Sequence, residues 1–162
     1  MPGPQFGWYC VKKHLLVPVD FSEVCLEAMP IALEMAKCMD ADLTLVHVVS
    51  GSGRSSVVPG RASRPPPAKM MSGVGDEEAL LKRVRETQFA DVEEVTLQLI
   101  SADGHAAAAI ARHAEDMSMD MIVMTTHGRS GFTHALMGSV TEAVIRSATC
   151  PVLVVRAAEP TD

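Results

Sequence analysis

Glycine and hydroxyl residues between residues 125 and 139 form the part of the sequence best suited to bind an anion. Gly128 and Gly131 follow an apolar segment, and Gly138 and Ser139 come directly before a helical pattern at residues 140–147. Glycine lets the backbone approach a ligand closely and adopt positive φ. A helix N-terminus leaves N–H donors unpaired and carries partial positive charge. These residues therefore predict a phosphate site, and phosphate sites commonly hold nucleotides.

The order and spacing of these glycines exclude the two commonest phosphate loops. A Walker A loop needs Gly-Lys-Ser or Gly-Lys-Thr, and the sequence contains neither. A dinucleotide fingerprint follows the first strand, whereas Gly128 and Gly131 follow the fourth apolar segment. Ser139 and Glu142 also fit a capping box, so an alternative role for Ser139 is only to cap its helix.

Five strand patterns and four helical patterns predict the framework that must position this site. Near-continuous apolar strands are typical of a parallel sheet covered on both faces, and their alternation with helices predicts a single Rossmann-like α/β domain. Pro30 predicts either a kink or the start of the regular helix around it. The strand patterns lie at residues 14–19, 43–49, 95–100, 119–124 and 152–155, and the helical patterns at 22–39, 76–89, 104–117 and 140–147.

The composition outside these elements predicts a short tail at each end and one flexible loop. We expect an irregular tail over residues 1–12, the domain over 13–157 and a second tail over 158–162. Residues 50–75 are rich in Gly, Ser and Pro, with four basic residues and no acidic one. Such a segment is too polar and too interrupted to pack, so it is predicted to be a flexible loop.

Charge and cysteine content exclude several classes of function. The net charge of −6 argues against general nucleic-acid binding, which depends on Lys and Arg. The four cysteines include no C-x-x-C pair, so no zinc or redox motif is predicted and mostly buried, reduced thiols are expected. Neither a run of about 18 apolar residues nor a signal peptide is present, so we expect a cytoplasmic protein that does not contact a membrane.

Together, these motifs resemble the universal stress protein family, in the subgroup that binds ATP. That subgroup carries the pattern G-x2-G-x9-G-[ST] after its fourth strand. Here Gly128, nine further residues, Gly138 and Ser139 match the pattern, and Thr125 stands where its first glycine is expected. The resemblance continues through SVTEAVIRSATCPVLVV at residues 139–155 and includes HLLVPVDFS at residues 14–22.

The resemblance implies the sheet order 3-2-1-4-5, with ATP held between strands one and four and Mg²⁺ or Mn²⁺ as the ion that would bridge its phosphates. Asp20 would contact the edge of the adenine, and the backbone of Val48 would also meet the base. Gly128, Gly138 and Ser139 would contact ribose and phosphates. The full set of residues expected to contact the nucleotide is Pro18, Val19, Asp20, Val48, Thr125, Gly128, Arg129, Ser130, Gly131, Gly138, Ser139 and Val140.

The function predicted from these residues is that of an ATP-binding regulatory protein of the stress-response type, without catalytic residues or a dedicated metal site. A hydrolase needs a placed base and cationic stabilisers, so at most slow ATP hydrolysis is expected. His127 is predicted to be a turn residue, and His47 a packed strand histidine without a partner acid.

The alternative is a non-catalytic dimerising module whose nucleotide site is degraded, and Thr125 is the residue that favours it. The apolar strand at residues 152–155 would be an edge strand, which invites pairing with a second copy. The resemblance likewise implies a homodimer formed through this strand. A nucleotide-transferring enzyme is not supported, because the sequence contains neither further motifs nor a substrate domain.

Overall fold

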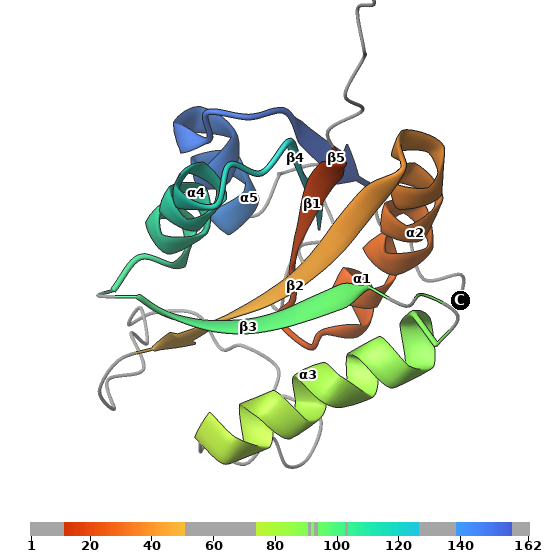
Figure 1. Ribbon diagram of the computed structural model, residues 1–162. Helices are drawn as coiled ribbons and strands as arrows, with labels where there is room; N and C mark the ends of the chain where they lie inside the picture. Colours follow the sequence, from red (N-terminus) through yellow and green to blue (C-terminus); the bar gives the residue numbers. More distant parts are fainter. Residues whose placement is uncertain are drawn as a thin grey trace, which may run out of the picture.

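Five parallel strands form one sheet in the order β3-β2-β1-β4-β5 (Figure 1), which confirms the predicted α/β fold and strand order. The computed structural model describes residues 12–50, 74–90, 92, 94–102, 104–126 and 139–156. The elements are β1 (Lys13–Pro18), α1 (Glu23–Leu26), α2 (Ala28–Met39), β2 (Ala41–Ser50), α3 (Val74–Gln88), β3 (Val95–Ala102), α4 (Ala106–Asp116), β4 (Met121–Thr125), α5 (Ser139–Ser147) and β5 (Val152–Val155).

The helical pattern predicted over residues 22–39 is divided into two helices. Ser22 caps α1, since its hydroxyl accepts the N–H of Cys25 at 3.1 Å, and Glu27 separates α1 from α2. Pro30 is the third residue of α2, where its missing N–H would have no intrahelical acceptor. The regular helix therefore starts beside Pro30. The prediction of four helices is wrong, because the structure has a fifth, the short helix α1.

Helices cover both faces of the sheet (Figure 1), and an apolar cluster of side chains lies between the helices and the sheet on each face. On one face, α2 and α3 pack over Leu15, Val17 and Leu45. On the other, α4 and α5 pack over Leu16, Val46 and Ile122. Because strand side chains alternate between faces, β1 contributes to both clusters and lies at the centre of the core.

The cysteines differ in part from their predicted burial. Cys25 is buried, and desolvation raises the pKa of its thiol to about 12. Cys150 is half-buried and Cys38 is exposed on α2, and all three are free thiols. The prediction of mostly buried thiols is therefore wrong for Cys38, which lies on the solvent side of an amphipathic helix.

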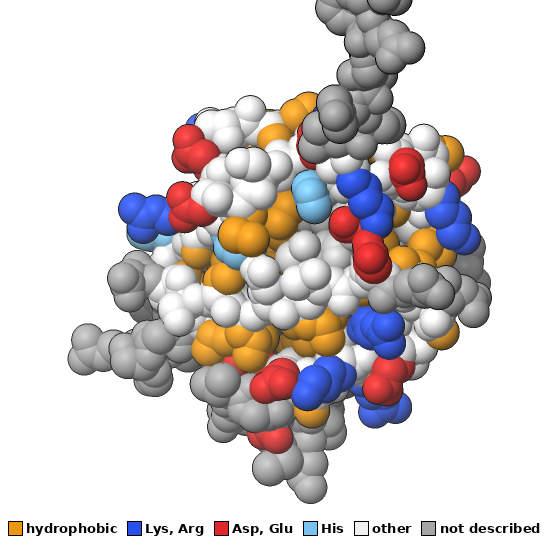
Figure 2. All heavy atoms as spheres, viewed as in Figure 1, with side chains coloured by type: hydrophobic (Ala, Val, Ile, Leu, Met, Phe, Trp, Pro, Cys, Tyr) orange, Lys and Arg blue, Asp and Glu red, His pale blue; other side chains and the backbone are white. Residues whose placement is uncertain are grey.

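The surface carries acidic and basic side chains side by side on the face that Figure 2 shows, without a continuous basic area there. In the part of the chain that the structure describes, no helix is long and apolar enough to cross a membrane. No group of three or more His, Cys, Asp or Glu side chains among the described residues could hold a metal ion. Apart from Lys12, the two predicted tails lie outside the described residues. The same holds for the predicted loop except for Ser50, Val74 and Gly75.

Candidate functional site

The sheet opens between β1 and β4, where the strand order reverses. Their ladder pairs Leu15 with Met121 and Leu16 with Ile122, and it goes no further toward the carboxyl ends. Beyond it each strand bonds its other neighbour: the Val19 N–H donates to Val46 at 2.8 Å, and the Thr126 N–H to Val155 at 3.0 Å. In open α/β sheets, ligands bind at the carboxyl ends of strands at this switch point. The predicted residues of both strands flank it.

On the β1 side, Asp20 is held in a tight turn. Its Oδ1 accepts the Ser22 N–H at 2.9 Å and the Ser22 hydroxyl at 2.6 Å. Phe21, between them, has a φ of 61°, a left-handed conformation that non-glycine residues adopt at a cost. Such strain is commonly found where a fold fixes a functional segment. The carboxylate of Asp20 is therefore fixed in place at the end of β1.

On the β4 side, a buried hydrogen bond ties the first turn of α5 to the strand end. The Thr141 hydroxyl donates to the Thr125 carbonyl at 2.8 Å, and both residues are buried. Ser139 and Val140, the first two residues of the nine-residue helix, are exposed. The first turn of α5, whose N–H groups have no acceptor within the helix, therefore lies beside the carboxyl end of β4.

Both residues of the capping-box alternative lie in the first turn of α5. Ser139 is the first residue of α5, and the carboxylate of Glu142 accepts a hydrogen bond from Arg146 one turn later. Glu142 forms an ordinary i,i+4 pair on the exposed face of the helix.

The remaining predicted residues divide into two groups. Pro18, Val19 and Val48 lie at the carboxyl ends of β1 and β2, where Pro18 is paired in register with Val46, two residues before Val48. Five other predicted contacts lie outside the described residues: Gly128, Arg129, Ser130, Gly131 and Gly138. His127 lies outside them as well.

His47 is a packed, hydrogen-bonded strand residue, as predicted, but it does have an acidic partner. Its Nδ1 lies 2.6 Å from the Val19 carbonyl, and its Nε2 lies 3.7 Å from Oε1 of Glu77 in α3. Glu77 follows the long predicted loop, so no local spacing relates it to His47. The sequence indicates only that His47 and Glu77 belong to consecutive elements of the chain, and this does not predict that they are in contact.

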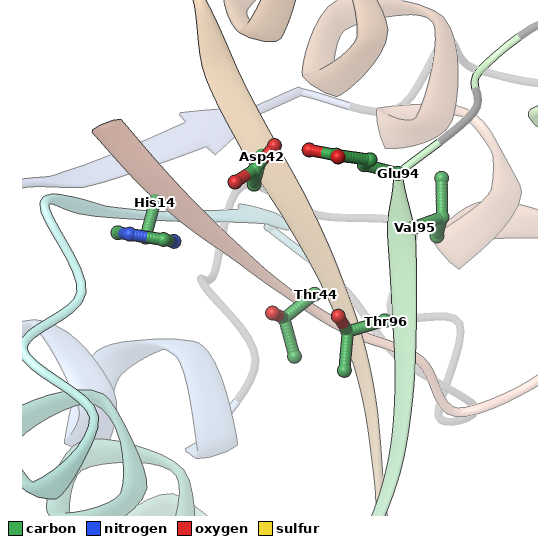
Figure 3. Close-up of a pocket in the computed structure, with 6 residues that line it drawn as sticks. All are labelled: His14, Asp42, Thr44, Glu94, Val95 and Thr96. Carbon is green, nitrogen blue, oxygen red and sulfur yellow. The ribbon is translucent and has the colours of Figure 1, made fainter. Parts of the chain in front are cut away.

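A separate pocket of about 280 Å³ lies at the opposite, amino edge of the sheet (Figure 3). Lys12 forms ion pairs with both of its acids, Asp42 and Glu94, and this contact lowers the pKa of Asp42. The close-up shows Thr44 and Thr96 side by side farther along the strands. A pocket with two carboxylates and an already paired ammonium disfavours an anion, so it is not the predicted nucleotide site.

Comparison with known sequences identifies the family to which this fold belongs. The sequence profile described as "Universal stress protein family" matches residues 12–156. This chain belongs to the universal stress protein family. It is 35% identical over 144 residues to "Universal stress protein MJ0531" of Methanocaldococcus jannaschii, covering 89% of this chain and 82% of that protein.

Two solved structures show the same fold with nucleotides bound. One is a universal stress protein in complex with cAMP, with a TM-score of 0.64 at 20% identity, covering 91% of this chain and 98% of that one. The other is the universal stress protein from Archaeoglobus fulgidus in complex with dAMP, with a TM-score of 0.63 at 18% identity, covering 88% and 96%. At these identities the likeness establishes the fold of this universal stress protein chain.

Proposed function

We propose that this protein binds ATP as a regulatory ligand, at the switch point between β1 and β4. The observation that carries the proposal is the pairing of two fixed elements across the diverging strands. The Asp20 turn lies at the end of β1, and the first turn of α5 is tied to the end of β4 through Thr141 and Thr125. One offers a carboxylate to a base, and the other offers N–H donors to phosphates.

Phosphate binding would rest on local donors, because the protein as a whole is acidic. Exposed N–H groups at the start of α5, together with Gly138 and Ser139, suit this role. Arg129 and Ser130 in the preceding segment would add a charge-assisted contact. Mg²⁺ or Mn²⁺ would then be held chiefly by the phosphates themselves, since backbone N–H groups and an Arg side chain are not metal ligands.

Thr125 is compatible with a bound nucleotide in this arrangement. Thr125 is only 7% exposed at the carboxyl end of β4, so the fold accommodates the volume of its side chain. The two relatives solved with cAMP and dAMP support an adenine nucleotide as the class of ligand. Turnover beyond slow hydrolysis is not part of the proposal, because catalysis would need a placed base and cationic stabilisers.

The direct test is to identify what the purified protein carries. Protein prepared without added nucleotide is denatured, and the released small molecules are identified by mass spectrometry. We expect an adenine nucleotide in near-stoichiometric amount. For protein stripped of it, ATP at about 100 times its Kd should add about 2.7 kcal/mol of stability. For a chain of this size that raises Tm by about 5–10 °C. An empty protein with no ATP-dependent shift in Tm would overturn the proposal.

A second candidate function, a dimerising module, is favoured by the position of β5. The strand is apolar, half-buried and at the edge of the sheet, paired with β4 alone. The carbonyls of Pro151 and Val155 accept N–H groups from the β4 side. Because strand groups alternate, the N–H and carbonyl of Val154 face away from β4. A second copy could pair along this edge with or without ATP.

Substituting Val154→Lys should weaken such a dimer at least tenfold, because a charged side chain on an edge strand opposes pairing. Sedimentation equilibrium of both proteins gives the dissociation constants. Ile31→Lys, which changes an exposed apolar residue of α2, is the matched control and should leave the dimer intact. A wild-type protein that is monomeric at micromolar concentration would rule out the dimer.

A further inference from the structure

His47 joins three elements directly behind the proposed base-binding segment. It lies on β2, one residue before Val48, and it is 7% exposed. Its Nδ1 is 2.6 Å from the Val19 carbonyl, and its ring centroid is 4.3 Å from that of Phe21 with the planes tilted by 36°. Both contacts are with the segment that holds Asp20.

The direction of the Nδ1 contact follows from its partner. A carbonyl oxygen only accepts, so Nδ1 carries the hydrogen and donates to Val19. Nε2 then faces Oε1 of Glu77 at 3.7 Å, and these two groups form an ion pair when the imidazole is protonated. The other carboxylate oxygen of Glu77 is buried without a hydrogen bond to any described residue. His47 is therefore oriented from both sides, by Val19 and by α3.

The segment of residues 19–21, which His47 contacts, includes a strained backbone conformation. Phe21 is in the left-handed region with a φ of 61°. A non-glycine residue adopts this conformation at a cost in free energy and keeps it only where the surroundings fix it. The neighbouring carbonyl of Pro18 accepts the Cys25 thiol at 3.5 Å, a weak contact. The short contact to Val19 and the tilted ring of His47 therefore add to the Ser22 hydrogen bonds that hold this turn, and both are stronger restraints than the Cys25 contact.

We propose that His47 is a positioning residue for the nucleotide site, acting through the Val19 carbonyl and the Phe21 ring to fix the Asp20 turn. This inference rests on the proposed function only in its effect on affinity. The effect on the turn itself is a property of the nucleotide-free protein. Glu77 extends the link to α3, so the orientation of the α3 N-terminal turn also bears on the base-binding segment.

Two amide substitutions separate the two nitrogens of His47. In His47→Asn the side-chain NH2 replaces Nδ1 and retains the donor to Val19, whereas in His47→Gln it replaces Nε2 and reaches only toward Glu77. We expect His47→Asn to bind ATP within about threefold of wild type. We expect His47→Gln to lose about tenfold, the cost of leaving a buried carbonyl unpaired. Isothermal titration gives the affinities, and His105→Asn, at the exposed start of α4, is the control.

Amide hydrogen exchange in the absence of nucleotide gives the independent readout. The Ser22 N–H, which donates to Asp20, should exchange at least about tenfold faster in His47→Gln and unchanged in His47→Asn. If the wild type binds no ATP, the proposed function fails, and this exchange alone decides the role of His47. Equal exchange at Ser22 in both variants overturns the inference. So does an equal loss of ATP affinity in both variants, since it would mean that the Nδ1 donor is not what matters.

Discussion

A Gly138→Val protein is expected to bind ATP about 100-fold more weakly than wild type and to remain folded. Gly138 directly precedes Ser139, the first residue of α5, whose first turn is tied to Thr125 by the 2.8 Å bond from Thr141. A branched side chain there would hold phosphate away from the N–H donors of that turn. Losing one or two charge-assisted contacts costs about 3 kcal/mol, or about 100-fold in Kd by isothermal titration.

The two serines of α5 provide the matched control for this result. Ser139 opens the helix, and Ser147 ends it with its hydroxyl bonded to the Ala143 carbonyl. Ser139→Ala should weaken ATP binding several-fold, whereas Ser147→Ala should leave it unchanged. Because valine is a poor residue before a helix, Gly138→Val also costs about 1 kcal/mol of stability. An affinity equal to wild type in Gly138→Val would mean that the start of α5 is not the phosphate site.

The fold could be predicted from the sequence because its signals are local and repeated. Strands such as β1 and β5 are short apolar runs, and the bounds of β5 were predicted to the residue. The short α1 was missed because its separation from α2 depends on Glu27, where no Gly or Pro marks a break. Pro30 is the residue in this segment that predicts a break, although it is harmless in the first turn of a helix.

The site was predictable only as far as its residues follow strand ends. Asp20 comes shortly after β1 and Thr125 is the last residue of β4, and the sheet order brings their segments to the same switch point. The contact between His47 and Glu77 could not be predicted, because a predicted loop of residues 50–75 separates them in sequence. The strained backbone of Phe21 could not be predicted either, since nothing in its side chain favours positive φ.

The second large effect is expected in the core, from Phe89→Ala. Phe89 is 1% exposed, and it has the largest fully buried side chain among the described residues. It packs in the cluster with Leu81 and Val84 from α3, and Leu43 from β2. Replacing it with alanine leaves a cavity under α3 and should cost about 3–5 kcal/mol of unfolding free energy, measured by urea denaturation. That is a large share of a typical total of about 5–15 kcal/mol.

This loss of stability should leave ATP affinity unchanged at temperatures where the variant is folded. α3 ends at Gln88, shortly before β3 begins, so Phe89 lies toward the amino edge of the sheet, whereas Asp20 and Thr125 lie at its carboxyl edge. Met117→Ala, at a residue 48% exposed beyond α4, is the control and should cost less than about 1 kcal/mol. If Phe89→Ala weakens ATP binding as much as His47→Gln does, then α3 acts on the site through its packing as a whole. If the affinity is unchanged, the influence of α3 on the site is confined to the contact between Glu77 and His47.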